Sequence, residues 1–427
     1  MLGKSLIYFA SNVVNALIPL ALLPILTRVL TVEEYGQVGL FQTLVTAYAG
    51  IVGLTAAGAA GRKYFDEEVS REDMATYVGA AFQILLLSVV PILLLTVLLA
   101  PFGAERLDIP VGWILAAAIV PAFNVLILTR LVQWQVRGEA LRYGSLQIGL
   151  SALNFVLSIG LVIWAGWDGA GRVIGQVAAT AAVGLIAVIL LKRDALLSFF
   201  SWRPGQLKEI LAYGLPLVPH TFGLFVLAYA DRVIVADMLG LERAGMYIAV
   251  VQLAAGAHLV FDAINKAYIP WLYERLAKDV ANEKIHIVRM TYAWYVVIAL
   301  GVALAFVIAP PIFVFIAGEA YAEAAPVVGW IALGQGLSGM YLMVTNYVFY
   351  ARRTGLLAVT TSISAAVAIG ALIVLVERYG MLGAAYAFCI GMTVRFVLTW
   401  WAAQWTHPMP WLAALRPRPQ AGGEAVL

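Results

Sequence analysis

The residues best suited to chemistry in this sequence are charged and amide side chains set within long apolar runs. His220, Asp231 and Arg232 lie in one such run, and Arg395 lies in the middle of another. A charged side chain at membrane depth is costly, and it usually faces a partner or a water-filled cavity. These residues are therefore candidates for lining a route through a membrane rather than for catalysis.

The run around Asp231 is the richest in polar groups. His220 and Asp231 are 11 residues apart, close to three helical turns, so they share a helix face beside Arg232. One interpretation is a polar stripe along a central pathway. The alternative is an Asp231–Arg232 pair bonded to neighbouring helices near the outer surface. His220 alone fits a hydrogen-bonded structural histidine as well as a proton-sensing one.

Two further sites carry intramembrane charge. Asp262 and Lys266 are four residues apart, so they are neighbours on one helix face near its inner end. They either belong to the pathway or form an interfacial salt bridge whose lysine extends to the headgroups. Arg395 has no local partner, which leaves an anion-binding group or one half of an interhelical pair.

The first apolar run contains paired amides and prolines. Asn12 and Asn15 lie about one turn apart, and Pro19 follows on nearly the same face. Prolines kink helices, and broken helices in transporters commonly bend about the substrate site. Contacts between asparagines on different helices are the alternative. Arg28 closes the run as an interfacial anchor or as a phosphate ligand. The further polar candidates are Asn124, Arg130, Gln335 and Asn346.

The sequence offers no catalytic or metal-binding motif. It lacks a phosphate-binding G-x-x-x-x-G-K-[ST] loop, its four histidines are scattered, and its single cysteine is Cys389. We therefore expect no enzyme activity, no ATP hydrolysis, no metal, no cofactor and no nucleic-acid partner.

Composition places these residues in a membrane protein. The chain of 427 residues is 63% hydrophobic and only 12% charged. A spanning helix needs about 20 apolar residues, so the chain holds about 12 spans. Only helices or closed barrels satisfy the backbone in hydrocarbon, and runs of this length indicate helices. The predicted spans are 5–29, 38–60, 77–100, 113–133, 145–166, 173–191, 210–237, 245–268, 290–316, 326–350, 357–376 and 383–403.

Lys and Arg residues follow alternate loops. With the N-terminus inside, 20 of the 27 fall in inner segments and five in outer ones. Inner loops of membrane proteins are enriched in these residues, so both termini are predicted to be cytoplasmic. The predicted organisation is a six-helix bundle over 1–191, a cytoplasmic linker over 192–209, a second six-helix bundle over 210–403, and a disordered cytoplasmic tail over 404–427.

The two predicted bundles resemble each other. The segment from Leu30 to Gly36 shares Leu, Glu and Gly with the segment from Leu239 to Gly245, 209 residues later. Gly171 and Gly383, which follow the turns before the sixth and twelfth spans, are 212 residues apart. Two features at nearly one offset indicate a 6+6 duplication with a pseudo-twofold axis along the membrane normal.

Three segments resemble one known family, the Wzx-like polysaccharide-biosynthesis flippases of the multidrug/oligosaccharidyl-lipid/polysaccharide exporter superfamily. The segment from Leu26 to Gly36 is similar to the family's turn after span one. The segment from Asp231 to Gly240 is similar to its D-R-[LVI]-x-[IV]-x-x-x-L-G string, and Gly383 to Ala387 to its last-span start. The order and spacing of these matches cover essentially the whole chain.

The resemblance implies a flippase that moves an isoprenoid-pyrophosphate-linked oligosaccharide from the cytoplasmic to the outer leaflet of the bacterial inner membrane. Two six-helix bundles would rock about a polar or cationic cavity, driven by an ion gradient or the membrane potential. Arg232, Arg395 and Lys266 would suit the pyrophosphate, since Arg is the better phosphate fork. Membrane lipids and glycan-polymerase or export machinery are the other implied partners.

Four alternatives stay open at this point. A peptidoglycan-precursor flippase keeps the fold but usually carries two extra spans. A cation-coupled drug exporter favours an acidic, aromatic pocket. A polytopic glycosyltransferase or polymerase usually has a long outer loop, whereas the outer loops here are short by the predicted spans. A scaffold in a glycan-export complex is the fourth.

Overall fold

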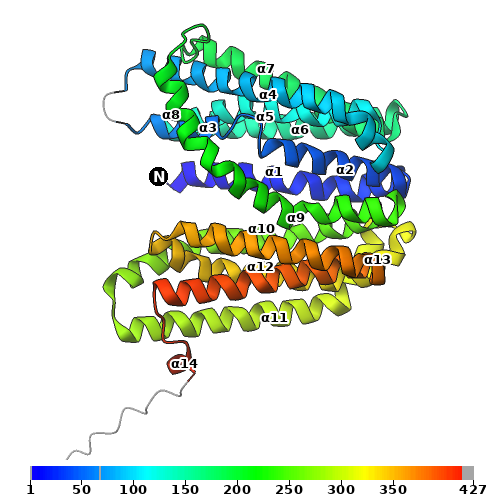
Figure 1. Ribbon diagram of the computed structural model, residues 1–427, viewed down its shortest axis with the longest axis vertical. Helices are drawn as coiled ribbons and strands as arrows, with labels where there is room; N and C mark the ends of the chain where they lie inside the picture. The colour runs from blue at the N-terminus through cyan, green and yellow to red at the C-terminus, as the bar shows by residue number, and fades with distance from the viewer. Residues whose placement is uncertain (1, 67–68, 416–427) are drawn as a thin grey trace, which may run out of the picture.

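The apolar runs of the sequence form long helices in a computed structural model that describes residues 2–66 and 69–415. The helices lie nearly side by side and divide into two lobes (Figure 1). The described residues contain no strand, which confirms the all-α fold class. The first lobe holds α1 (Leu2–Val29), α2 (Val32–Ala49), α3 (Ala56–Lys63), α4 (Arg71–Leu107), α5 (Val111–Val136), α6 (Ala140–Ile159), a π-helical turn (Gly160–Trp164) and α7 (Asp168–Arg193).

A short helix, α8 (Pro204–Gly214), leads from the first lobe into the second. Proline at its first position suits a helix start, because that N–H has no helical partner. The second lobe holds α9 (Val218–Leu239), α10 (Leu241–Lys278), α11 (Ala281–Ala317), a 3-10 turn (Glu319–Ala324), α12 (Ala325–Tyr350), α13 (Thr354–Thr406) and α14 (Trp411–Ala414). The helix α8 crosses the predicted boundary between the linker and the second bundle, and the domain boundaries stay predictions.

Three predicted spans differ in detail from the helices observed. The second is interrupted, because the chain leaves helical geometry between α2 and α3, where Gly53, Leu54 and Thr55 have positive φ. The eleventh and twelfth are joined in α13 and separated only by a kink at Gly380, with φ 58° and ψ −135°. Glycine suits that left-handed φ because it has no Cβ.

The described residues contain nine helices long and apolar enough to cross a membrane. One of the nine is α13, whose 53 residues are long enough for two crossings separated by the kink at Gly380. The helices α2 and α9 are not among the nine, because they carry polar residues such as Glu33, Asp231 and Arg232. Counting α13 twice and adding α2 and α9 gives the 12 predicted crossings. Both α2 and α9 therefore need a polar surrounding at these residues.

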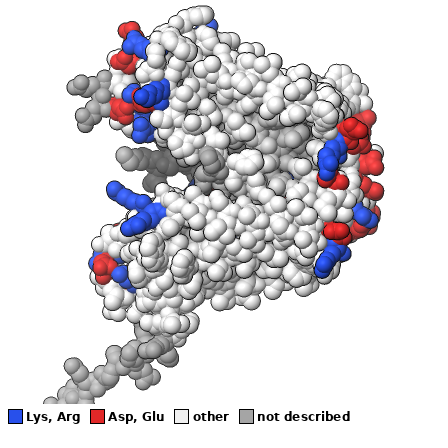
Figure 2. Space-filling view, viewed as in Figure 1, with Lys and Arg blue, Asp and Glu red and all other residues white. Residues whose placement is uncertain are grey.

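Charged residues gather at the two ends of the helices, which Figure 2 shows as separate patches with an uncharged surface between them. One end, the basic end, holds the connections from α3 to α4, α7 to α8, α10 to α11 and α12 to α13. The other, the acidic end, holds the connections from α1 to α2, α4 to α5, α6 to α7, α9 to α10 and α11 to α12. The predicted topology assigns the basic end to the cytoplasm, and that orientation stays a prediction.

The repeated glycines occupy matching places. A Cβ on Gly36 of α2 would lie 2.5 Å from the Leu241 carbonyl oxygen, and one on Gly245 of α10 would lie 2.1 Å from the Val32 carbonyl oxygen. The two copies of the repeat therefore meet backbone to backbone. Gly171 and Gly383 likewise press against the preceding helix of their own lobe, where a Cβ would lie 2.8 Å and 1.9 Å from backbone atoms.

The two lobes share one hydrophobic core at the acidic end. Leu26, Tyr35 and Leu40 of the first lobe pack there with residues such as Tyr247 and Phe313 of the second. At the basic end the lobes have separate cores, one between α3, α4, α7 and α8, and one between α10, α11, α12, α13 and α14. The lobes are thus joined at the acidic end and apart at the basic end.

Part of the predicted disordered tail is ordered, which corrects the prediction for residues 404–415. Trp411 is buried beside the rings of Tyr292 and Trp400, and its Nε1 donates to Gln404 Oε1 at 2.8 Å. The segment folds back because its indole fills the basic-end core of the second lobe. Residues 416–427 lie outside the described part of the chain.

Candidate functional site

Two connected cavities lie between the lobes. The larger, the C cavity, has a volume of about 1170 Å³ and is lined mostly by helices α9, α10, α12 and α13. The smaller, the N cavity, has a volume of about 550 Å³ and is lined mostly by α1, α2, α6, α7 and α10. Thr46, Tyr229, Arg232 and Ala255 line both, so the cavities are continuous. The C cavity reaches Tyr273 near the basic end, whereas the shared core closes the acidic end.

Arg395 lies in the C cavity with its charge uncompensated. Its guanidinium stacks 3.9 Å from the centroid of the Tyr341 ring. Within the described part of the chain it has no carboxylate partner, and its buried Nε has no hydrogen-bond acceptor. An aromatic face offsets only part of the cost of desolvating a cation. Among the described residues Arg395 forms no interhelical ion pair, and its role as an anion-binding group stays a prediction.

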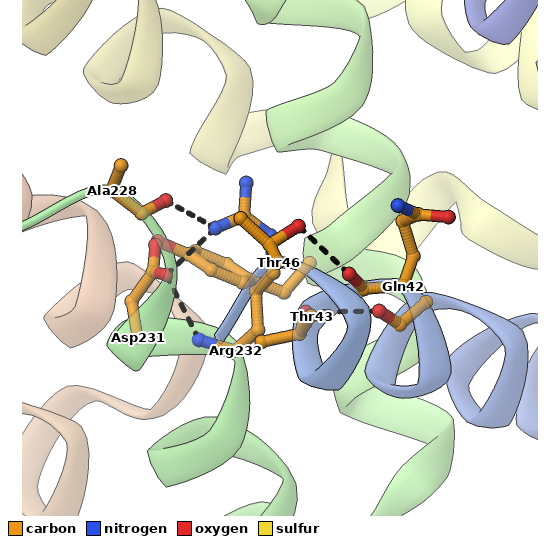
Figure 3. Close-up of polar contacts among 8 residues, drawn as sticks. Gln42, Thr43, Thr46, Ala228, Asp231 and Arg232 are labelled. Carbon is orange, nitrogen blue, oxygen red and sulfur yellow. Dashed lines mark hydrogen bonds and ion pairs between the residues drawn. The ribbon is translucent and has the colours of Figure 1, made fainter. Parts of the chain in front are cut away.

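Asp231 and Arg232 form a local ion pair at the junction of the two cavities, with Nη1 and Oδ1 3.1 Å apart. Tyr247 Oη donates to the second Asp231 oxygen at 2.7 Å. Arg232 also donates to the Ala228 carbonyl and stacks on the Tyr229 ring at 4.5 Å. Figure 3 shows its guanidinium beside α2. The pair is mostly buried, and the remaining Arg232 donors face the junction.

The N cavity holds a third guanidinium that sequence reasoning missed. Arg172 lies near the start of α7, where its Nη1 donates to Asn154 Oδ1 at 2.9 Å and to Ser158 Oγ at 3.0 Å. Among the described residues that line this cavity, none is acidic. The sequence placed Arg172 in an outer loop because it lies next to the turn. The available signal was Asn154 and Ser158 at helical spacing in the preceding span.

Four predicted residues lie outside both cavities or make other contacts. Asp262 and Lys266 form the expected pair at 2.6 Å, but the lysine is 71% exposed and neither lines a cavity. Asn12 lies on α1 away from the N cavity and accepts from Gln147 at 3.2 Å. Arg28 donates to the Phe315 carbonyl of the other lobe at 2.9 Å. It therefore joins the lobes at the acidic end.

Of the remaining predicted residues, Asn15 lines a cavity and His220 has no described side chain. Asn15 lines the N cavity, and its Oδ1 accepts from Ser151 at 2.6 Å. The backbone of His220 belongs to α9, but its side chain lies outside the described part of the structure. The histidine found in the C cavity is His258 of α10.

The other polar candidates separate into cavity and structural residues. Asn124 lines the N cavity, and Gln335 and Asn346 line the C cavity. Arg130 is fully buried, pairs with Asp194 at the basic end and stacks on Trp134, so it holds the first lobe together. Within the described residues, no group of His, Cys, Asp and Glu is arranged to hold a metal ion.

Fold and site together define a multi-pass membrane protein with the two-lobed fold of transporters. Two solved structures share this fold at low identity. A multidrug resistance MATE family transporter of the MOP superfamily, in an inward-facing conformation, aligns with TM-score 0.66 and 16% identity over 92% of this chain and 93% of that chain. The lipid II flippase MurJ, in an inward closed conformation, aligns with TM-score 0.69 and 14% identity over 95% of this chain and 88% of that chain.

The chain belongs to the family described as "Polysaccharide biosynthesis protein", whose model matches residues 1–276. Two relatives from Haemophilus influenzae agree. "Lsg locus putative protein 1" is 24% identical over 378 residues, covering 87% of this chain and 90% of the relative. An "Uncharacterized membrane protein" is 22% identical over 382 residues, covering 87% and 89%. The resemblance drawn from the sequence is confirmed.

Proposed function

We propose that this chain is a flippase that moves an isoprenoid-pyrophosphate-linked oligosaccharide from the cytoplasmic to the outer leaflet of the bacterial inner membrane. The observation that carries the proposal is Arg395, a cation without a carboxylate partner among the described residues, in the larger cavity between the lobes. A buried cation is stable when an anion reaches it. Guanidinium groups match pyrophosphate oxygens in geometry and charge.

The arrangement of the lobes supports transport by alternating access without ATP hydrolysis. The acidic end is closed by the shared core, and the C cavity extends toward the basic end. With the basic end in the cytoplasm, this is the state that receives a substrate from the inner leaflet. An ion gradient or the membrane potential would supply the energy, and Asp231 and His258 are the titratable cavity groups suited to coupling.

The character of the cavities favours this cargo over the alternatives. A cation-coupled drug exporter needs acidic groups for cationic cargo, but Asp231 is the only acid among the described lining residues, and Arg232 neutralises it. A peptidoglycan-precursor flippase remains the second candidate, because the lipid II flippase has the same fold. Both candidates carry a lipid-linked pyrophosphate, so both depend on Arg395.

The test is complementation in a strain that lacks this gene. Arg395→Gln removes the cation and keeps a polar side chain, so surface polysaccharide should fall at least about tenfold while lipid-linked glycan accumulates. Immunoblotting checks that the variant reaches wild-type abundance. The matched control is Arg378→Gln, because Arg378 lies on the same helix, is exposed and lines neither cavity. Full export by Arg395→Gln would refute the proposal.

A further inference from the structure

The two cavities differ in the polar groups they present. In the C cavity, Asn346 Nδ2 donates to Asn265 Oδ1 at 2.8 Å, and both amides are buried. The remaining polar lining there is Gln335, His258, the charged groups and hydroxyl side chains such as those of Thr221, Ser338 and Thr345, and the rest is aliphatic or aromatic. A sugar entering the C cavity would therefore meet few free amide groups.

The N cavity presents amides that remain open. Asn15 and Asn124 are exposed although each lies near the middle of its helix, at the depth of the membrane interior. Gln42 is also exposed, and its Oε1 accepts from Gln176 at 2.9 Å. An exposed amide at this depth is stable only where water or a polar ligand reaches it.

The free hydrogen-bonding groups of the N cavity are mainly donors. Asn15 and Gln42 use their carbonyl oxygens in protein contacts, which leaves their NH₂ groups free. Asn154 accepts from Arg172 through its oxygen as well, while Asn124 makes no side-chain hydrogen bond within the described residues. Amide NH₂ groups are matched by hydroxyl, ring and acetamido oxygens of sugars.

From this contrast we propose that the cavities divide one substrate between them. The N cavity is the glycan subsite, with Asn15 of α1 and Asn124 of α5 as specificity-determining residues that both line it. The C cavity and the junction hold the pyrophosphate, through Arg395 and Arg232. The volume of about 550 Å³ lies within the range of small-ligand sites and suits a short oligosaccharide. This inference rests on the proposed function and adds the place where the sugars bind.

The experiment uses the full chain in nanodiscs and two probes. The first is polyprenyl-pyrophosphate-linked glycan extracted from a strain that lacks this gene, and the second is synthetic polyprenyl pyrophosphate without sugar. The affinity of each is obtained from the rise in unfolding temperature during titration, because a ligand of the native state stabilises it by mass action.

Asn15→Ala and Asn124→Ala should each weaken the glycan probe about tenfold, the cost of one or two hydrogen bonds, and leave the sugar-free probe unchanged. Arg395→Gln should weaken both probes. The matched control is Asn12→Ala. Asn12 lies three residues from Asn15 on α1 and has a similar hydrogen bond, but it does not line the N cavity.

Two other outcomes overturn the inference in different ways. If Asn15→Ala and Asn124→Ala weaken both probes equally or neither, while Arg395→Gln weakens both, the glycan subsite is wrong and the proposed function stands. If the wild-type chain binds neither probe, the proposed function fails and this inference fails with it.

Discussion

The acidic and basic ends of this molecule are built differently, although the same helices run through both. At the acidic end, Gly36 and Gly245 bring the two lobes into backbone contact within a shared core. At the basic end, each lobe has its own core, and the C cavity reaches the space between them. Closure is therefore a property of one end, whereas each lobe has a core of its own at the other.

The largest expected effect concerns the basic end. Trp411→Ala removes a buried indole from the core of the second lobe and should lower the free energy of unfolding by about 4 kcal/mol. Chemical denaturation of the purified protein measures it. Trp405→Ala is the control, because Trp405 is 64% exposed. If the ends are independent, Trp411→Ala leaves unchanged the rate at which a thiol reagent enters from the acidic end.

The second prediction concerns a variant that should open the closed acidic end. Gly245→Ala places a Cβ 2.1 Å from the Val32 carbonyl oxygen. Because this oxygen belongs to the backbone, it cannot move away without straining the helix. The strain of about 3 kcal/mol should open that end. A thiol reagent applied from the acidic side should then label a reporter cysteine at position 46 (Thr46→Cys) about a hundredfold faster. The assay uses a membrane-impermeant thiol reagent in a Cys389→Ala background.

A matched glycine on the same helix provides the control for that variant. The Cβ of Gly256→Ala would meet its nearest heavy atom, Leu20 Cδ1, at an ordinary 3.5 Å. It should label like the parent chain. Equal labelling of both glycine variants would contradict the assignment of the Gly36–Gly245 contact as the closure point.

The third prediction removes one hydrogen bond between the lobes. Tyr35 Oη donates to Gln252 Oε1 at 2.9 Å. Tyr35→Phe should cost about 1 kcal/mol and raise acidic-side labelling about fivefold. Tyr48→Phe on the same helix removes a hydroxyl that accepts from Thr96 within the first lobe, so it should leave labelling unchanged.

The smallest effect comes from an exposed ion pair between the lobes. Arg106 Nε and Asp237 Oδ1 are 2.6 Å apart, but the arginine side chain is 73% exposed. Arg106→Gln should raise acidic-side labelling no more than about twofold at low salt, and the difference should vanish at high salt. Arg243→Gln removes a pair within the second lobe and should have no effect at either salt concentration. An effect of Arg106→Gln that persists at high salt would contradict this ranking.

Most of the fold could be predicted from the sequence because hydrocarbon dictates helix length and because Lys and Arg mark alternate loops. The interrupted second span was not predictable from apolarity alone, since the break at Gly53 depends on its packing against the Val125 side chain. The ordered tail was missed for a similar reason. Trp411 is anchored by distant aromatic rings rather than by local periodicity.

The candidate site was only partly predictable. A charged side chain within an apolar run is recognisable in the sequence because its free-energy cost in the membrane implies a function. Arg395 and Asp231 were predicted as site residues for this reason. The sequence does not show which face of a helix lines a cavity. Lys266 and Asn12 were therefore predicted together with residues that do line one. Arg172 was missed because the predicted span begins at residue 173. An error of one helical turn in that boundary is enough to assign a cavity residue to a loop.

The meeting of Gly36 with Gly245 has an evolutionary consequence. Equivalent positions of the two related halves contact each other across an axis, as equivalent residues do in a twofold homodimer. An ancestor of half this length would have assembled in that way, with two identical chambers. In a single chain the two halves need not be identical. Counting from Gly171 and Gly383, Arg172 corresponds to Ala384 and Arg395 to Val183, so each half now carries an arginine that its twin lacks.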